Sequence, residues 1–322
     1  MTTGPLAPLL LLGGLLLLVF GGRLLIDGAV GIAARMRVPP LIVGLTVVAW
    51  GTSAPELAFN AIAASQGRGA LVFGNVVGAN ICNLALILGI AALMRPIAVA
   101  SRLLRFEMPV VAVLQSTLLV VALVRLGGGG GGSFTRIDGA ALLLAFLAVS
   151  VVTTLSVKRG GADEAVAPPP HGAAPRDAAK TISGLVLLGL GGALAAEGAV
   201  GTARLLGVPE SVVGLTIVAI GTTLPELVTG IIAVRRGQVG LLVGNIVGSC
   251  IFNVGAILGL CTLLWSVPIP EGGVGALAVL TVLGVLLLPM SVTHDRRIAR
   301  VEGVLLLLVY GVFLAAQGIH AL

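Results

Sequence analysis

Charged side chains are scarce in this chain. Asp, Glu, Lys and Arg make up 10% of its 322 residues, whereas hydrophobic residues make up 57%. So few polar groups cannot cover the surface of a soluble domain of this length, which excludes a soluble globule and indicates lipid as the surrounding solvent. The composition therefore predicts an all-α integral membrane protein embedded in the lipid bilayer.

Cysteine and histidine are also rare, with three residues of each. Cys82, Cys250 and Cys261 all fall inside apolar stretches, and neither Cys82 nor Cys250 has a Cys or His neighbour at metal-ligand spacing. We interpret them as small apolar fillers rather than as disulfide partners or thiolate ligands. No histidine lies in the apolar core and no nucleophile–base pair is visible, so we expect no enzyme and no cofactor.

Stretches of about 20 apolar residues, long enough to cross about 30 Å of hydrocarbon, recur along the whole chain. The sequence predicts ten transmembrane helices, at residues 7–34, 39–64, 70–94, 106–125, 137–157, 181–205, 208–234, 239–265, 272–293 and 301–320. The first is not interpreted as a cleaved signal peptide, because no Lys or Arg precedes Arg23.

Positive charges orient these spans. With the N-terminus outside, the internal loops carry fourteen Lys and Arg residues, and the external loops carry only Arg68, Arg125, Arg136 and Arg204. This asymmetry predicts a multi-pass protein of the plasma (inner) membrane with both termini outside. It also accounts for the net charge of +6, so the basicity does not indicate a nucleic-acid partner.

The chain repeats itself at an offset of 170 residues. The segment 44–56, Gly-Leu-Thr-Val-Val-Ala-Trp-Gly-Thr-Ser-Ala-Pro-Glu, returns at 214–226 as Gly-Leu-Thr-Ile-Val-Ala-Ile-Gly-Thr-Thr-Leu-Pro-Glu. Five spans per copy is an odd number, so the halves are expected to enter the membrane in opposite directions, as two inverted five-helix repeats. We expect a first half at 1–157, an internal linker at 158–180 and a second half at 181–322. The repeated regions cover about 39–94 and 208–265.

Each copy of the motif places one glutamate, Glu56 or Glu226, inside an apolar segment. A carboxylate in hydrocarbon costs several kcal/mol unless it is paired, so an intramembrane acid indicates a functional site. The proline before each glutamate removes a backbone N–H, and the carbonyls of Gly51 and Gly221, four residues earlier, lose their helical partners. Discontinuous helices that present carbonyls to a cavity are typical of cation sites in secondary transporters.

Hydroxyl groups accompany the glutamates. Thr52 and Ser53 precede Glu56 by four and three residues, on the same helix face, and two threonines hold these places before Glu226. Two facing sets of this kind supply six to eight oxygens, the number that Ca²⁺ takes, and two glutamates balance its charge. The alternative is a kinked helix whose acid reaches out to the membrane interface.

Asparagines follow in the next span of each half. Asn83 and Asn253 lie at equivalent depths, and a buried amide oxygen can bind a cation without adding charge. We interpret them as ligands or cavity lining, with interhelical hydrogen bonding as the alternative. Asn75 and Asn245 lie within GxxxG patterns that permit close helix approach, so we favour interhelical hydrogen bonds for them.

These motifs resemble the paired α-repeats of the calcium/cation antiporter superfamily, in its prokaryotic sodium/calcium exchanger branch. The resemblance covers nearly the whole chain and is carried by Gly51–Glu56, Gly74–Asn83, Gly221–Glu226 and Gly244–Asn253. It implies ten transmembrane helices with a diamond of four ligand helices. It also implies a secondary active antiporter that drives Ca²⁺ transport with Na⁺ by alternating access.

The resemblance also implies a ligand set. It makes Glu56 and Glu226 the carboxylates shared by Ca²⁺ and Na⁺, with Asn83 and Asn253 lining the centre. Thr52 and Thr222 would donate carbonyls to Ca²⁺, and the flanking Na⁺ sites would include Ala49, Ser53, Ala219, Thr223 and Ser249. This chain departs from many relatives, which have Asp in place of Asn253 and Ser in place of Ala79. The missing serine removes one expected Na⁺ ligand and leaves coupling to three Na⁺ open.

Other functions fit parts of the pattern. A buried glutamate can carry H⁺ instead of Na⁺, so H⁺-coupled exchange on the same scaffold is the nearest alternative, and K⁺ dependence stays open. A cation channel is a remote alternative, because it needs a continuous pore, usually around an oligomeric axis. Asp27 and Glu197, near the ends of the first span of each half, are interpreted as structural or gating residues.

Overall fold

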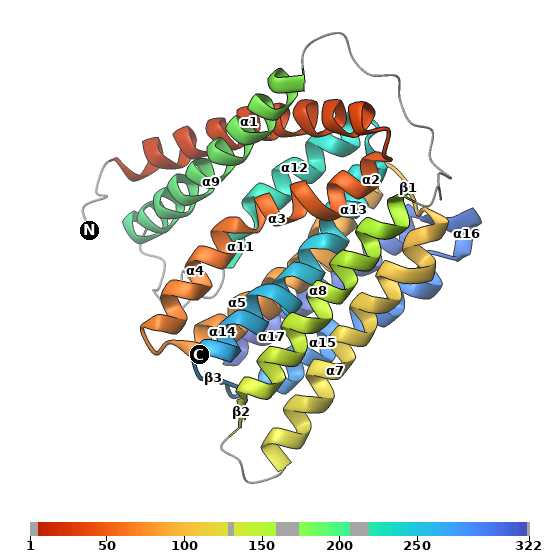
Figure 1. The fold of residues 1–322 in the computed structure, drawn as a ribbon. Coiled ribbons are helices and arrows are strands. Elements are labelled where there is room, and N and C mark those ends of the chain that lie inside the picture. Colours follow the sequence, from red (N-terminus) through yellow and green to blue (C-terminus); the bar gives the residue numbers. More distant parts are fainter. Residues whose placement is uncertain (1–5, 128–131, 159–173, 207–218, 321–322) are drawn as a thin grey trace.

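The computed structural model describes residues 6–127, 132–158, 174–206 and 219–320, and helices dominate it (Figure 1). The first half contains α1 (Ala7–Met36), α2 (Pro40–Val43), η1 (Gly44–Val48), α3 (Ala49–Thr52), α4 (Ala54–Ser65), α5 (Gly69–Ile81), η2 (Cys82–Ile87), α6 (Leu88–Met94), η3 (Leu103–Glu107), α7 (Met108–Gly127) and α8 (Arg136–Lys158). The second contains α9 (Ala174–Leu205), α11 (Ala219–Thr222), α12 (Leu224–Arg235), α13 (Val239–Ile251), η5 (Phe252–Leu258), α14 (Gly259–Leu264), α15 (Gly273–Met290), α16 (Thr293–Arg296) and α17 (Arg300–His320).

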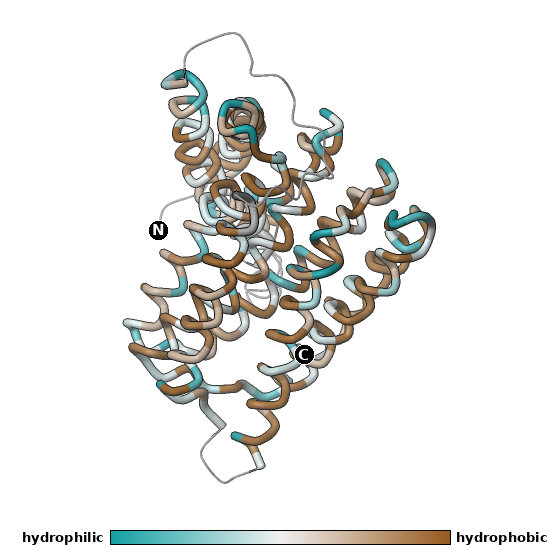
Figure 2. Tube along the Cα trace, turned by 45° about the vertical axis from the view of Figure 1, so that its right-hand side comes forward, coloured by the Kyte–Doolittle hydropathy of each residue, from teal (hydrophilic) through white to brown (hydrophobic). Residues whose placement is uncertain are grey.

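Seven of the described helices are long and apolar enough to cross a membrane, or eight if the bent pair 40–52 and 54–65 counts as one span. Figure 2 shows hydrophobic residues along the helices and hydrophilic residues mostly toward their ends. The total of ten stays a prediction, because residues 207–218 lie outside the described part of the chain and α17 is not among the seven.

One boundary differs from the sequence-based expectation. Helix α9 begins at Ala174, so the stretch 174–180, expected as linker, is helical. Asp177 in this first turn is buried and accepts a hydrogen bond of 2.6 Å from Arg35 of α1. This ion pair explains why the helix extends beyond its apolar residues. The rest of the expected linker, 159–173, lies outside the described residues, as do residues 128–131 of the glycine-rich loop.

The repeat in the sequence is also a repeat of elements. Helices α4 and α5 begin and end at residues that, shifted by 170, are the first and last residues of α12 and α13. A π-helical segment follows in each case, η2 in one half and η5 in the other. The two halves therefore share one local fold, while their opposite orientation in the membrane stays a prediction.

Short strands join the halves reciprocally. Strand β1 (Ile97–Ala98) pairs antiparallel with β4 (Arg297–Ile298), and β2 (Ser133–Phe134) pairs antiparallel with β3 (Val267–Pro268). Each two-stranded ribbon takes one strand from each half, and the ribbons lie at opposite ends of the molecule in Figure 1. The halves are therefore interlocked and are not separate globular units.

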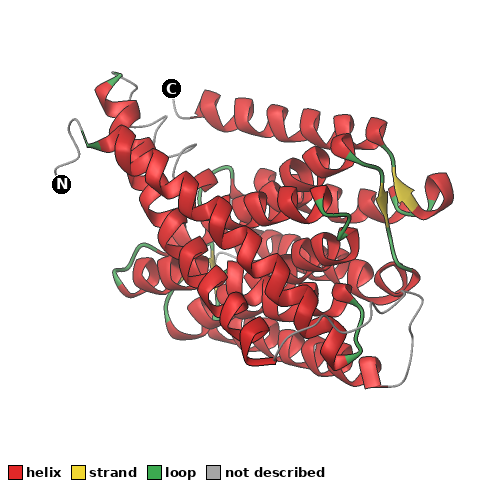
Figure 3. Cartoon of the chain, turned by 90° about the horizontal axis from the view of Figure 1, so that it is seen from above, coloured by secondary structure: helices red, strands yellow, loops and turns green. Residues whose placement is uncertain are grey.

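Helices of one half also pack against helices of the other half: α6 packs against α17, and α14 packs against α8. Glycines permit the close approach: a Cβ on Gly303 would lie 2.9 Å from the carbonyl oxygen of Gly89, and one on Gly139 would lie 2.8 Å from that of Gly259. Helices α1 and α9 pack along each other as a layer across the remaining helices (Figures 1 and 3).

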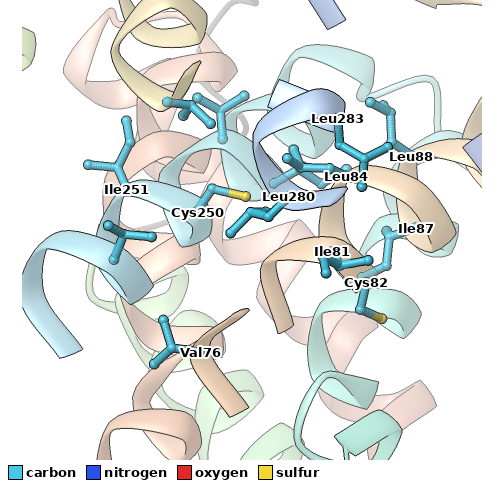
Figure 4. Close-up of a cluster of buried hydrophobic side chains, with 14 of the residues drawn as sticks. Val76, Ile81, Cys82, Leu84, Ile87, Leu88, Cys250, Ile251, Leu280 and Leu283 are labelled. Atoms are coloured by element: carbon cyan, nitrogen blue, oxygen red, sulfur yellow. The ribbon is translucent and has the colours of Figure 1, made fainter. Parts of the chain in front are cut away.

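The core lies where α5, η2 and α6 meet α13 and α15, and it includes Ile81, Leu84, Ile251 and Leu280 (Figure 4). All three cysteines are buried and free of disulfides. Their placement among aliphatic side chains agrees with their interpretation as fillers.

Candidate cation site

In each half, a helix is interrupted at a hydroxyl-bearing residue that lies three positions before the glutamate. Ser53 separates α3 from α4 with φ −87° and ψ 5°, and Thr223 separates α11 from α12 with φ −92° and ψ 3°. Proline is tolerated in the first turn of the following helix, where its missing N–H would have no partner. In the first half the two pieces differ in direction by 42°. The discontinuity expected from the prolines is therefore confirmed.

The break places both glutamates in the first turn of a helix, where the helix dipole favours negative charge. Glu56 and Glu226 are each only 1% exposed, and the hydroxyl of Ser53, three residues before Glu56, lies within hydrogen-bond distance of Glu226. Neither is turned toward lipid. Both carboxylate oxygens of Glu56 and Oε2 of Glu226 form no hydrogen bond within the described residues. Buried acceptors without donors are costly, so this region is suited to a positively charged ligand.

One side of the site, here called the Ser249 flank, comprises Ser53, Ser249, Glu226 and the carbonyl of Ala49. The Ser53 Oγ lies 3.1 Å from Glu226 Oε1 and 3.0 Å from Ser249 Oγ. The Ser249 hydroxyl in turn donates to the Ala49 carbonyl at 3.5 Å. Both serines are fully buried. Three separate segments of the chain thus bring four oxygens together, a set suited to a hard cation.

The residues equivalent to these at the 170-residue offset, here called the Ala79 flank, are Thr223, Ala79 and Glu56. Ala79 is 3% exposed and supplies no oxygen from its side chain. The Thr223 Oγ1 lies 3.4 Å from the sulfur of Cys82. Ala219 begins α11, but its side chain lies outside the described part of the structure. The two flanks therefore differ in their side-chain oxygens, although they derive from one repeated motif.

Asparagines of the GxxxG patterns connect each half to the motif of the other. The Thr52 hydroxyl donates to Asn245 Oδ1 at 3.2 Å, and Asn75 Nδ2 donates to Thr222 Oγ1 at 3.2 Å. Asn75 also accepts a bond of 2.7 Å from Asn60. The interhelical interpretation of these asparagines is confirmed, and it follows that each motif threonine is positioned by the opposite half.

Asn83 and Asn253 are buried in the π-helical segments, 1% and 2% exposed. Asn253 Nδ2 donates to Asn80 Oδ1 at 3.1 Å, while the amide oxygens of Asn83 and Asn253 form no hydrogen bond within the described residues. These two oxygens are thus available to a ligand, and a role as ligands or cavity lining stays a prediction.

Sequence reasoning missed two buried asparagines. Asn60 donates to the Glu56 carbonyl at 2.7 Å, and its position four residues after that glutamate could have revealed it. Asn80 supports Asn253, but its counterpart at the 170-residue offset is Cys250. The comparison of the repeats therefore held no signal for Asn80.

Asp27 and Glu197 lie away from the buried site. Asp27 is exposed and forms a salt bridge with Arg236, which connects α1 to the end of α12. Glu197 is exposed on α9. Within the described residues, no three His, Cys, Asp or Glu side chains form a group that could hold a metal ion. A cation bound here would thus depend on hydroxyl, carbonyl and amide oxygens as well as the two carboxylates.

Comparisons with known proteins agree with this geometry. The profile of the sodium/calcium exchanger protein family matches residues 6–155 and 178–318. The putative antiporter CaxA of Alkalimonas amylolytica is 37% identical, over 94% of this chain and 96% of its own. The sodium/calcium exchanger MaX1 of Methanosarcina acetivorans is 31% identical, over 95% and 97%. A solved structure of the sodium-calcium exchanger NCX_Mj, soaked with Na⁺ and Ca²⁺, superposes with a TM-score of 0.83 at 30% identity, over 97% and 98%.

Proposed function

The chain belongs to the sodium/calcium exchanger family, a family of multi-pass cation antiporters, and from this premise we propose that it exchanges Ca²⁺ for Na⁺ by alternating access. The observation that carries the proposal is the pair of buried glutamates, one from each half, with three carboxylate oxygens that form no hydrogen bond to described residues.

Charge explains why the two ions exchange. Two carboxylates carry two negative charges, which one Ca²⁺ or two Na⁺ neutralise. Because the empty, doubly charged site is costly to carry through hydrocarbon, the protein changes conformation readily only when one set of ions is bound.

The proposed ligands of Ca²⁺ are the carboxylates of Glu56 and Glu226 and the backbone carbonyls of Thr52 and Thr222. The side-chain amides of Asn83 and Asn253 are proposed to line the same site. Na⁺ is proposed to bind the same glutamates through their flanks, with Ala49, Ser53 and Ser249 on one side and Ala219 and Thr223 on the other.

We also propose the membrane arrangement. Ten spans form two inverted halves in the plasma membrane, with both termini outside and the linker between α8 and α9 in the cytoplasm. The positive charges of the expected internal loops support this orientation. The reciprocal ribbons and the matching element bounds support the symmetry.

Purified full-length protein in proteoliposomes tests the function. Vesicles loaded with Na⁺ should accumulate ⁴⁵Ca²⁺ from a Na⁺-free medium, whereas imposed K⁺ or H⁺ gradients alone should not drive uptake. Glu56→Gln and Glu226→Gln should each reduce uptake to the level of empty vesicles. Glu271→Gln, which changes an exposed glutamate, is the matched control and should leave uptake unchanged. Full activity of either buried-glutamate variant would reject the site.

H⁺-coupled exchange is the second candidate, and a specific observation favours it. Neither carboxylate oxygen of Glu56 has a hydrogen-bond partner in the described residues, and Ala79 brings no hydroxyl to that flank. A protonated Glu56 would need no Na⁺ ligand. Uptake driven by a pH gradient in Na⁺-free vesicles would establish this alternative and overturn Na⁺ coupling.

A further inference from the structure

An apolar groove of about 630 Å³ lies between α15 and α17, away from the cation site. Only glycines and apolar side chains line it, including Ala276, Val279, Leu286, Met290, Leu305 and Val312. Leu305 and Val312 are 47% and 69% exposed, so the groove opens outward. Figure 3 shows α17 along one edge of the molecule. The groove follows α15 from Gly272 to Met290, about 27 Å at 1.5 Å per residue, close to the thickness of a bilayer core.

The two ends of the groove differ in their exposed charged residues. Beside Gly272 stands Glu271, which is exposed. Beyond Met290 the chain turns through α16 and β4 into α17, where Arg297 and Arg300 are exposed and form no salt bridge to a described carboxylate.

Strand pairing enlarges this basic end. Because β4 pairs with β1, the segment 95–105 of the first half lies beside it and contributes exposed Arg95 and Arg105. Two acidic residues lie in the same segment of the chain. Glu302 is buried and accepts hydrogen bonds from the Thr293 hydroxyl and the Ala299 N–H, whereas Asp295 is exposed. Positive charge therefore predominates at the Met290 end.

We propose that this groove binds an anionic phospholipid, with an acyl chain along Leu283, Leu286 and Leu305 and the phosphate on Arg297 and Arg300. The groove offers a hydrocarbon chain only apolar contacts, and guanidinium groups match phosphate oxygens in pairs. Basic groups beside grooves between transmembrane helices recognise anionic head groups in this way. The proposal does not depend on which ion drives Ca²⁺ transport.

Native mass spectrometry of the full-length protein, stripped of lipid in detergent and then mixed with phosphatidylglycerol or phosphatidylcholine, tests the proposal. The unchanged protein should retain one phosphatidylglycerol per chain at about tenfold lower lipid concentration than phosphatidylcholine. The double variant Arg297→Gln, Arg300→Gln should lose this preference. Arg136→Gln, an exposed arginine beside the opposite ribbon, should retain it.

A second variant tests the groove itself. Val279→Trp narrows the groove at its middle and should reduce retention of both lipids at this site while Arg297 and Arg300 remain. Equal retention of the two lipids by the unchanged protein would overturn the proposal, as would an equal loss in Arg136→Gln. A dimer that dissociates when Val279→Trp fills the groove would show that a second copy of the chain is the occupant, and would also overturn it.

Discussion

The Ser249 flank and the Ala79 flank of the cation site derive from the same motif, yet only the first has a hydroxyl at the equivalent position of α13 and α5. The glutamate and the motif threonine are the same in both halves. The groups proposed for Ca²⁺ are thus those that the repeats share, whereas the groups proposed for Na⁺ differ at Ser249 and its equivalent Ala79. A duplicated site can therefore keep a symmetric divalent centre while its monovalent flanks diverge.

Ser249→Ala should have the largest effect on this comparison, because it removes the hydroxyl that distinguishes the flanks. A hydrogen bond or ligand contact to a charged group contributes about 1.5–3 kcal/mol, so the Na⁺ concentration for half-maximal ⁴⁵Ca²⁺ efflux should rise about 10- to 100-fold. Calcium affinity measured without Na⁺ by calorimetry should change less than about threefold. The control is Ser116→Ala on α7, whose hydroxyl bonds only its own helix at Ala112. An equal loss of affinity for both ions would contradict the division between flanks and centre.

Ala79→Ser makes the flanks alike and should have the next largest effect. The added hydroxyl should lower the half-saturating Na⁺ concentration several-fold and raise the Hill coefficient for Na⁺ toward one additional ion. Ala91→Ser, at a buried alanine about 18 Å further along the same continuous helix, controls for the effect of a hydroxyl in the core. Unchanged Na⁺ cooperativity in Ala79→Ser would mean that the missing hydroxyl does not limit Na⁺ binding.

Asn75→Ala and Asn245→Ala compare the hydrogen bonds by which each half of the protein holds the motif threonine of the other half. Asn75 bonds both Asn60 and Thr222, whereas Asn245 bonds Thr52. A hydrogen bond contributes about 0.5–1.5 kcal/mol, so both variants should unfold at lower temperature, and Asn75→Ala, which loses two such bonds instead of one, should unfold first. Thermal unfolding followed by tryptophan fluorescence, with and without Ca²⁺, measures the difference. A larger loss of stability in Asn245→Ala would reverse the order inferred from the contacts.

Asp27→Asn should have the smallest effect. Its salt bridge with Arg236 is exposed, and exposed pairs contribute about 1 kcal/mol or less and are screened by salt. The equivalent of Arg236 in the first half is Gln66, so Glu197 has no such cation at the matching position. Asp27→Asn should therefore lower thermal stability slightly at low salt, and Glu197→Gln should leave it unchanged. A large, salt-independent loss of transport in Asp27→Asn would assign this pair a role in gating.

Much of the fold could be read from the chain. Within the described residues, the apolar stretches predicted helix bounds within a few residues, apart from the early start of α9, and the repeated prolines predicted the breaks at Ser53 and Thr223. The glutamates and asparagines predicted for the site are buried, as are its hydroxyl residues except the partly exposed Thr222, and many of them meet. Asn80 was overlooked because its bond with Asn253 joins the two halves, whereas Asn60, which bonds the Glu56 carbonyl within its own helix, could have been found from its spacing.

Sequence information was sufficient for the local features of this protein, because hydrocarbon offers no hydrogen bonds and every backbone group must be satisfied within its own helix unless a proline prevents it. The partners across the halves could not be deduced in this way. The contacts of Ser53 with Ser249, of Thr52 with Asn245, and of β1 with β4 join residues far apart in the chain. Such pairs form through the close packing of helices and strands from both halves, and that packing depends on the shape of the whole molecule rather than on the spacing of residues within one segment.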